Sequence, residues 1–157
     1  MIIYCLQKYK FYYYDKLEDE NVENILVLGY FNSKTFLDNA VEICKKHEIN
    51  GNELRIIEYD IDLMKKQKYL YVLSYAYYTL PDDDTYNDYE YLFEPQTNKK
   101  KCLILKEKLK KNPKFMHNKN KSYEDYTIQG FFIEKFELNK LYCVLDKNET
   151  NDFKHSK

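Results

Sequence analysis

Glycine and arginine are scarce in this 157-residue sequence, and their scarcity excludes several kinds of site. The three glycines, Gly29, Gly51 and Gly130, stand far apart, so the chain has neither a GxGxxG loop nor a GxxxxGK(S/T) phosphate loop. The GxSxG motif of α/β-hydrolase nucleophiles is missing as well. Arg55 is the only arginine, which leaves little capacity for bidentate clamps on carboxylate or phosphate.

Histidine and cysteine are also few, and their spacing suits no catalytic or metal site. The three histidines, His47, His117 and His155, have no cysteine or serine placed to form a nucleophile–base pair. The cysteines form no CxxC pair and no zinc spacing: they are Cys5, Cys44, Cys102 and Cys143. The acidic run at 82–90 lacks the glycine and spacing of an EF-hand loop. We therefore expect no enzyme activity, no cofactor and no metal, and we expect reduced cysteines buried in the core.

No apolar run approaches the roughly 18 residues that a membrane-spanning helix needs. The first ten residues lack the basic region and the small-residue cleavage site of a secretory signal. The sequence thus predicts a soluble, cytoplasmic protein with no membrane partner. Its wealth of Lys, Asn, Tyr and Ile, whose codons are AT-rich, indicates a bacterial or phage origin.

Aromatic residues are abundant, with 18 Tyr and 9 Phe, and they mark an internal repeat. Residues 4–15 read YCLQKYKFYYYD, and residues 71–82 read YVLSYAYYTLPD. Both runs are typical of a β-strand with one buried face. In each copy an acidic stretch follows, and then a second strand is expected at 25–31 or 89–93. Each copy therefore begins as a β-hairpin with a long polar tip.

A helix and a closing strand follow in both copies. The first helix is expected at 34–47 after Ser33, and the second at 99–111 after Thr97 or Asn98. Helical spacing predicts a buried stripe on each helix. In the first helix the stripe comprises Phe36, Leu37, Ala40, Val41 and Cys44, and in the second it comprises Cys102, Leu105 and Leu109. Closing strands are expected at 53–62 and 130–139.

The resulting prediction is an α+β protein made of a tandem duplicated ββαβ unit, with mostly antiparallel sheet and two helices packed on it. Handedness rules place the third strand of each copy beside its first. The first repeat with its linker spans 1–68, the second repeat with a short final strand at 141–145 spans 69–145, and a polar tail occupies 146–157. The short linker at 63–68 predicts one shared or closely abutting sheet and one compact unit.

This pattern resembles a small bacterial ββαβ domain of unknown function. Its members open with a YxL strand, pass through a G-x-(Y/F)-x-S turn into a helix, and close with FxIxxYxLD. The first copy carries the pattern at Tyr4, Leu6, Leu28, Gly29, Tyr30, Phe31, Ser33, Ala40, Tyr59 and Asp62. The second copy carries it at Tyr71, Leu73, Phe132, Phe136, Leu138 and Asn139, with Phe93-Glu94-Pro95 in place of the glycine turn. The resemblance implies this fold and implies no activity.

The net charge is only −1, yet the charges are segregated along the chain. Residues 15–24 hold five acids and one Lys, and residues 82–94 hold six acids and no base. Tyrosines flank both stretches, and Tyr is enriched in interface cores. This combination predicts a surface that binds a basic or nucleic-acid-binding protein. Its candidate residues are Tyr12, Tyr14, Asp15, Glu18, Asp19, Glu20, Asp82, Asp83, Asp84, Tyr86, Asp88 and Tyr89.

The opposite charge lies at 99–121, which holds ten Lys and one Glu. A lysine-rich helix near aromatic residues can follow a nucleic-acid backbone. The candidate residues for this alternative are Lys99, Lys100, Lys101, Lys108 and Lys111. Two functions are thus open. The first is a non-catalytic inhibitor or immunity/anti-defence protein that blocks a nucleic-acid-processing enzyme. The second is a nucleic-acid-binding accessory protein. The sequence does not indicate an oligomeric state.

Overall fold

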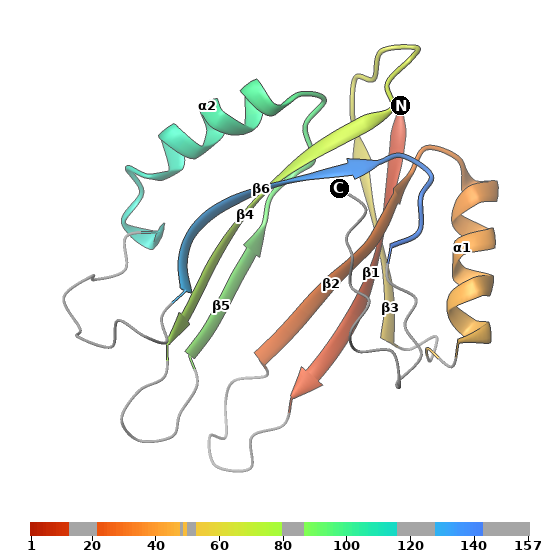
Figure 1. Cartoon of the computed structure of the whole chain (residues 1–157), viewed down its shortest axis with the longest axis horizontal. Helices are drawn as coiled ribbons and strands as arrows, with labels where there is room; N and C mark the ends of the chain where they lie inside the picture. Colours follow the sequence, from red (N-terminus) through yellow and green to blue (C-terminus); the bar gives the residue numbers. More distant parts are fainter. Residues whose placement is uncertain (13–21, 48, 50–52, 80–86, 116–127, 143–157) are drawn as a thin grey trace. The chain divides into compact units, whose positions relative to one another are not determined.

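The computed structural model describes residues 1–12, 22–47, 49, 53–79, 87–115 and 128–142. They form two consecutive ββαβ units (Figure 1). The first contains β1 (Ile2–Tyr12), β2 (Val22–Phe31), α1 (Lys34–Lys46) and β3 (Leu54–Asp60). The second contains β4 (Tyr69–Thr79), β5 (Asn87–Leu92), α2 (Lys99–Leu109), a 3-10 turn at Pro113–Phe115 and β6 (Ile128–Glu137). The expected α+β class and element order are confirmed.

Each unit has its own three-stranded antiparallel sheet, with orders β2-β1-β3 and β5-β4-β6. The third strand lies beside the first in both, as expected. In both units, a residue that pairs with the first strand lies the same number of residues before the helix. Phe31 pairs with Tyr4 three residues before α1, and Gln96 pairs with Tyr71 three residues before α2.

Of the two expected arrangements, a shared sheet is wrong for the described residues, and closely abutting sheets stay a prediction. Each third strand completes the sheet of its own unit, so no described strand of one unit pairs with a strand of the other. The compact division of the chain does not coincide with the two ββαβ units. One part is Met1–Leu70 together with the segment from Lys135 onward, and the other is Tyr71–Glu134. The division falls within β4 and β6. That the repeats pack as one compact unit stays a prediction.

The first unit has an aliphatic core between α1 and its sheet. Leu37, Ala40 and Cys44 of α1 are buried, as the helical spacing predicted, and they pack in one cluster with Leu6 and Leu28. Phe36 corrects the prediction, because 51% of its surface is exposed. At 100° per residue, Phe36 lies on the flank of α1 rather than on the face that meets the sheet.

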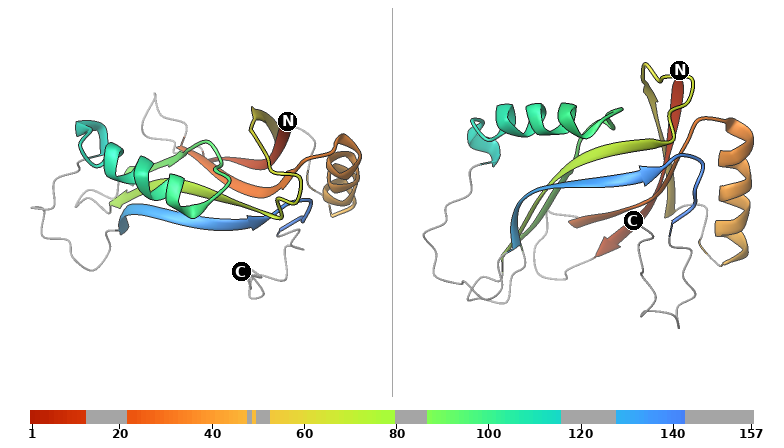
Figure 2. Two further views of the ribbon diagram at one scale, coloured as in Figure 1. Left: turned by 90° about the horizontal axis from the view of Figure 1, so that it is seen from above. Right: turned by 45° about the horizontal axis from the view of Figure 1, so that its top comes forward.

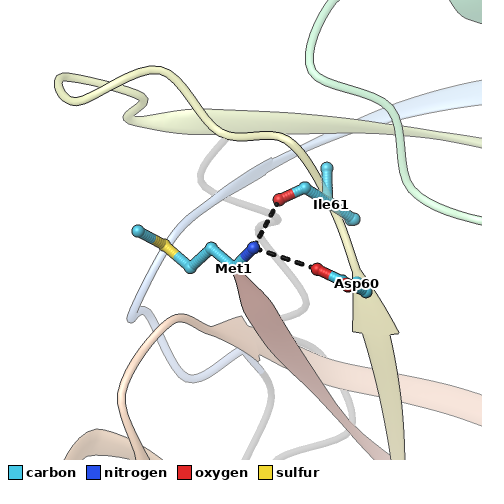
Figure 3. Close-up of polar contacts among 3 residues, drawn as sticks. All are labelled: Met1, Asp60 and Ile61. Carbon is cyan, nitrogen blue, oxygen red and sulfur yellow. Dashed lines mark hydrogen bonds and ion pairs between the residues drawn. The ribbon is translucent and has the colours of Figure 1, made fainter.

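The ends of β1 and β3 in the first unit also meet through charge. The amine of Met1 donates to Asp60 Oδ1 at 3.0 Å and to the carbonyl of Ile61 at 3.1 Å (Figure 3). The ion pair is solvent-exposed, so salt screens it and it adds little stability. It lies beside the last pair of the β1–β3 ladder, which joins Ile2 to Asp60.

A second part of the first unit comes from the far end of the sequence. After β6 the chain turns back to β2 (Figure 2), and we call residues Leu138–Tyr142 the clasp. The backbone N–H of Asn139 donates to Tyr30 O at 2.8 Å, and that of Tyr142 donates to Leu28 O at 2.7 Å. Asn139 adopts a positive φ of 62°, and its Oδ1 accepts from the backbone N–H of Asn32 at 3.0 Å.

The clasp replaces the first part of the short final strand that was expected at 141–145. Leu141 and Tyr142 are not in a strand, and 143–145 lie outside the described residues. The clasp contacts β2 through these separate hydrogen bonds, which do not make a continuous ladder.

The second unit has a different core. Of α2, only Cys102 is buried, while Leu105 and Leu109 are half-buried. The three predicted residues are therefore less exposed than the candidate lysines of α2, but only one of the three is fully buried. The space against the sheet is filled instead by Phe115, which is 8% exposed and comes from the turn after α2.

Candidate functional site

Most of the acidic, tyrosine-rich candidate residues lie outside the described residues. These are Tyr14, Asp15, Glu18, Asp19, Glu20, Asp82, Asp83, Asp84 and Tyr86. Three others belong to strands. Tyr12 is the last residue of β1 and pairs with Val22, and Asp88 and Tyr89 pair with Tyr78 and Tyr77. These three therefore lie in the parts of the hairpins that adjoin the acidic stretches.

The lysine candidates of α2 and of the turn after it are all described, and all are exposed: Lys99, Lys100, Lys101, Lys108 and Lys111. The helix that carries them begins at a well-formed cap, because Asn98 Oδ1 accepts from the backbone N–H of Lys101 at 3.0 Å. The one acid of the helix, Glu107, pairs with Lys110 at 3.0 Å. The helix thus presents a strongly positive outer face.

The end of α2 joins this positive face to aromatic rings. The chain continues from α2 through Asn112, whose Oδ1 accepts from the N–H of Lys114 at 3.0 Å. Phe115 then contacts three half-buried rings: Tyr91 at 5.5 Å, Phe93 at 5.6 Å and Phe131 at 5.8 Å between centroids. The Nζ of Lys114 lies 4.2 Å from the centroid of Tyr91.

Sequence reasoning missed this aromatic cluster. The predicted helix ends at 111, and no element or core residue is predicted for residues 113–115. One signal was present, since Phe115 is an apolar residue within a polar stretch. Nothing in the local pattern shows, however, that a single apolar residue in a turn reaches the core.

The cysteine prediction is confirmed for the three described cysteines. Cys5, Cys44 and Cys102 are buried and free of disulfides. Burial raises the pKa of Cys5 to about 11, although contacts with Tyr30 and Gln7 lower it in part. Burial also raises the pKa values of Cys44 and Cys102. These thiols are therefore protonated at neutral pH and are poor nucleophiles. Cys143 lies outside the described residues.

The described part of the chain brings together no group of three or more His, Cys, Asp or Glu side chains that could hold a metal. His47 is the exposed C-cap residue of α1, in keeping with its predicted position at a helix end. His117 and His155 lie outside the described residues. In the same described ranges, neither helix is long and apolar enough to cross a membrane.

No protein-family model, curated protein or solved structure matches this chain. The resemblance to a bacterial ββαβ domain of unknown function therefore rests on the fold and on the sequence pattern alone.

Proposed function

We propose that this chain is a non-catalytic protein-binding module whose acidic, tyrosine-rich hairpin segments bind and block a basic nucleic-acid-processing enzyme. One observation supports this above others. The β1–β2 ladder runs to the pair Tyr12–Val22, and the β4–β5 ladder runs to the pair Thr79–Asn87. The segments 13–21 and 80–86, which hold four and three acids, therefore each connect the two strands of an equivalent hairpin.

The chemistry of these segments suits a basic partner. Carboxylates attract a basic surface over about 8–10 Å and speed its approach. Tyrosines then supply rigid, amphipathic contact area at low entropy cost. The protonated state of the described cysteines agrees with a function that needs no nucleophile.

The proposal includes a biological setting. In a bacterial or phage cytoplasm, a small module of this kind acts as an immunity or anti-defence protein against a nuclease or a related enzyme. We also infer that the two ββαβ units arose by duplication, which gives the module two similar binding segments.

The direct test is an inhibition assay. Nucleic-acid-processing enzymes encoded by neighbouring genes are purified, and their activity is measured with increasing amounts of this chain. We expect stoichiometric inhibition that weakens as salt rises and that is lost when Asp82, Asp83 and Asp84 are changed to Asn. Inhibition that survives these changes and is insensitive to salt contradicts the proposal.

A second candidate function is binding of nucleic acid through α2. The exposure of Lys99, Lys100, Lys101 and Lys108 on α2, and of Lys111 in the turn after it, favours it. In this case the chain is an accessory protein rather than an inhibitor. The Lys108→Gln, Lys111→Gln double variant separates the two functions, since it should leave inhibition intact and should weaken binding to DNA or RNA.

A further inference from the structure

We propose that the surface formed by the end of α2 and strand β5 binds single-stranded nucleic acid in preference to a duplex. This inference rests on the second candidate function and deepens it, because it names the form of nucleic acid and the side chains that select it. Its side chains are none of the twelve candidate residues of the acidic, tyrosine-rich surface, although Asp88 and Tyr89 belong to the same strand β5.

The phosphate-binding half of the surface is the positive end of α2. Between 106 and 114 the chain holds five lysines and one acid. Glu107 is paired with Lys110, whereas Lys108, Lys111 and Lys114 are exposed. Backbone hydrogen bonds continue past the helix, from Asn112 N–H to Leu109 O at 2.9 Å and from Phe115 N–H to Asn112 O at 3.0 Å. The ordered turn after α2 therefore carries Lys111 and Lys114, and Lys114 reaches the ring of Tyr91 on the sheet.

The base-binding half is formed by two aromatic rings. Tyr91 lies in β5, and Phe93 directly follows that strand. Tyr91 and Phe93 are two residues apart, so their side chains lie on the same face of the sheet. Their rings stack with an interplanar angle of 26° and centroids 6.4 Å apart. Both rings are half-buried, and β5 is an edge strand. They offer adjacent stacking surfaces at the rim of the sheet rather than in its centre.

Phe115 and Lys114 join the two halves. Phe115 packs edge-on against Tyr91 at 88° and so fixes the ring from one side. Lys114 sits over the same ring at 4.2 Å, which shows that its electron-rich face accepts a cation. A base that stacks on Tyr91 takes the position of the Lys114 ammonium, which then becomes available to a phosphate.

This pairing of rings with lysines favours a single strand for a physical reason. Every base has a π-face, so stacking on aromatic rings tolerates any sequence, but a duplex keeps its bases stacked on one another. Lysines follow the phosphates of either form. Base-specific reading in a duplex groove relies largely on Arg, and Arg55 is the only arginine of the chain and belongs to the other unit.

The test is fluorescence anisotropy with labelled dT20 and a labelled 20-base-pair duplex, at several salt concentrations. We expect dT20 to bind at least about fivefold more tightly than the duplex. We expect Tyr91→Leu and Phe93→Leu each to weaken dT20 binding by at least about fivefold, the lower range for loss of one stacked base, without changing the salt slope. The Lys108→Gln, Lys111→Gln double variant should reduce that slope by about 1.4.

Controls guard against general unfolding and general polyanion binding. Tyr91→Phe keeps the ring and should preserve the affinity, and Lys34→Gln with Lys46→Gln on α1 removes two exposed charges and should change nothing. Circular dichroism checks that each variant is folded. If Tyr91→Leu unfolds the protein, the test uses Phe93→Leu and Lys114→Gln instead.

Four outcomes would each overturn the inference: equal binding of the duplex, equal binding of poly-glutamate, no binding of dT20 at low salt, or ring variants that bind normally. Tight duplex binding would still leave the second candidate function standing.

Discussion

The ring of Phe115 meets the ring of Tyr75 edge-on, with centroids 5.0 Å apart and an interplanar angle of 68°. Tyr75 is a buried residue of the central strand β4, and Phe115 comes from the turn after α2. This contact fills a part of the second unit that an aliphatic helix face fills in the first. The sheet is thus covered partly by α2 and partly by Phe115, and the rings of Tyr91, Phe93 and Phe131 around Phe115 are half-buried.

Phe115 should therefore contribute strongly to stability. Phe115→Ala should lower the free energy of unfolding by about 3–5 kcal/mol, since it removes a buried ring from a packed cluster. Phe132→Ala is the matched control, because Phe132 is 43% exposed and should cost far less. Urea unfolding followed by near-ultraviolet circular dichroism measures both. Equal costs for the two variants would show that Phe115 is not a core residue.

At Gly29 the clasp packs closely against β2. A Cβ added at Gly29 would lie 2.5 Å from the carbonyl oxygen of Lys140 and 2.8 Å from the Phe31 ring. Gly29→Ala should destabilise the first unit by about 1–3 kcal/mol, the usual cost of overpacking. Thr35→Ala, at an exposed site of α1, should change stability by less than about 0.5 kcal/mol. Chemical denaturation measures the free energy of unfolding of both variants. If Gly29→Ala leaves it unchanged, the clasp can shift away from β2 without cost.

The two helix N-caps should respond differently to the same change. The Asn98 side chain accepts a hydrogen bond from Lys101 N–H, whereas the Ser33 side chain makes no capping bond. Asn98→Ala should cost about 1 kcal/mol. Ser33→Ala should cost much less, since no hydrogen bond is lost. Thermal unfolding compares the pair, and a larger loss for Ser33→Ala would contradict the capping assignment.

Cys5 should make stability fall at alkaline pH. Its pKa is about 11 in the folded protein against a usual value of 9.0. Between these values the unfolded chain releases the proton while the folded chain keeps it, so folding loses up to about 3 kcal/mol as pH rises from 9 to 11. Cys5→Val, which copies Val72 of the second unit, should lose less over this range. Urea midpoints at pH 8 and pH 10.5 test this, and identical pH dependence in both proteins would refute it.

The buried thiols should also resist alkylation. In a Cys143→Ser variant, Cys5, Cys44 and Cys102 should not react with iodoacetamide at pH 8 until the protein unfolds, because thiolates are scarce and shielded. Intact-mass spectrometry counts the added groups. Rapid labelling of any of the three in the folded protein would place that thiol at the surface.

The acidic and tyrosine residues should affect different steps of partner binding. Changing Asp82, Asp83 and Asp84 to Asn should mainly slow association, because long-range attraction is lost. Tyr86→Ala or Tyr89→Ala should mainly speed dissociation, by roughly 1–2 kcal/mol if the ring is a hot spot. Lys108→Gln with Lys111→Gln should have little effect. Surface plasmon resonance against the inhibited enzyme separates the rates. The reverse pattern, with only the lysine change harmful, would favour the nucleic-acid function.

The sequence by itself determined the order of elements and their bounds to within about three residues, because the signals for these are local. Alternating aromatic strands and capped helices each act over a few residues, which is why α1 and α2 begin where Ser33 and Asn98 predict. Helical spacing also identified Leu37, Ala40, Cys44 and Cys102 as buried. The lysine face of α2 was visible in the same way, since its charges lie within one helix.

Only the tertiary structure decided which distant residues complete each core. The burial of Phe115 and the return of the clasp to β2 both depend on contacts between residues far apart in sequence. Such contacts are set by the shape left open when the elements pack, and no local pattern encodes that shape. For the same reason, the join between Lys114, Phe115 and Tyr91 could be seen only in the folded unit, where a turn after α2 meets the edge of a sheet.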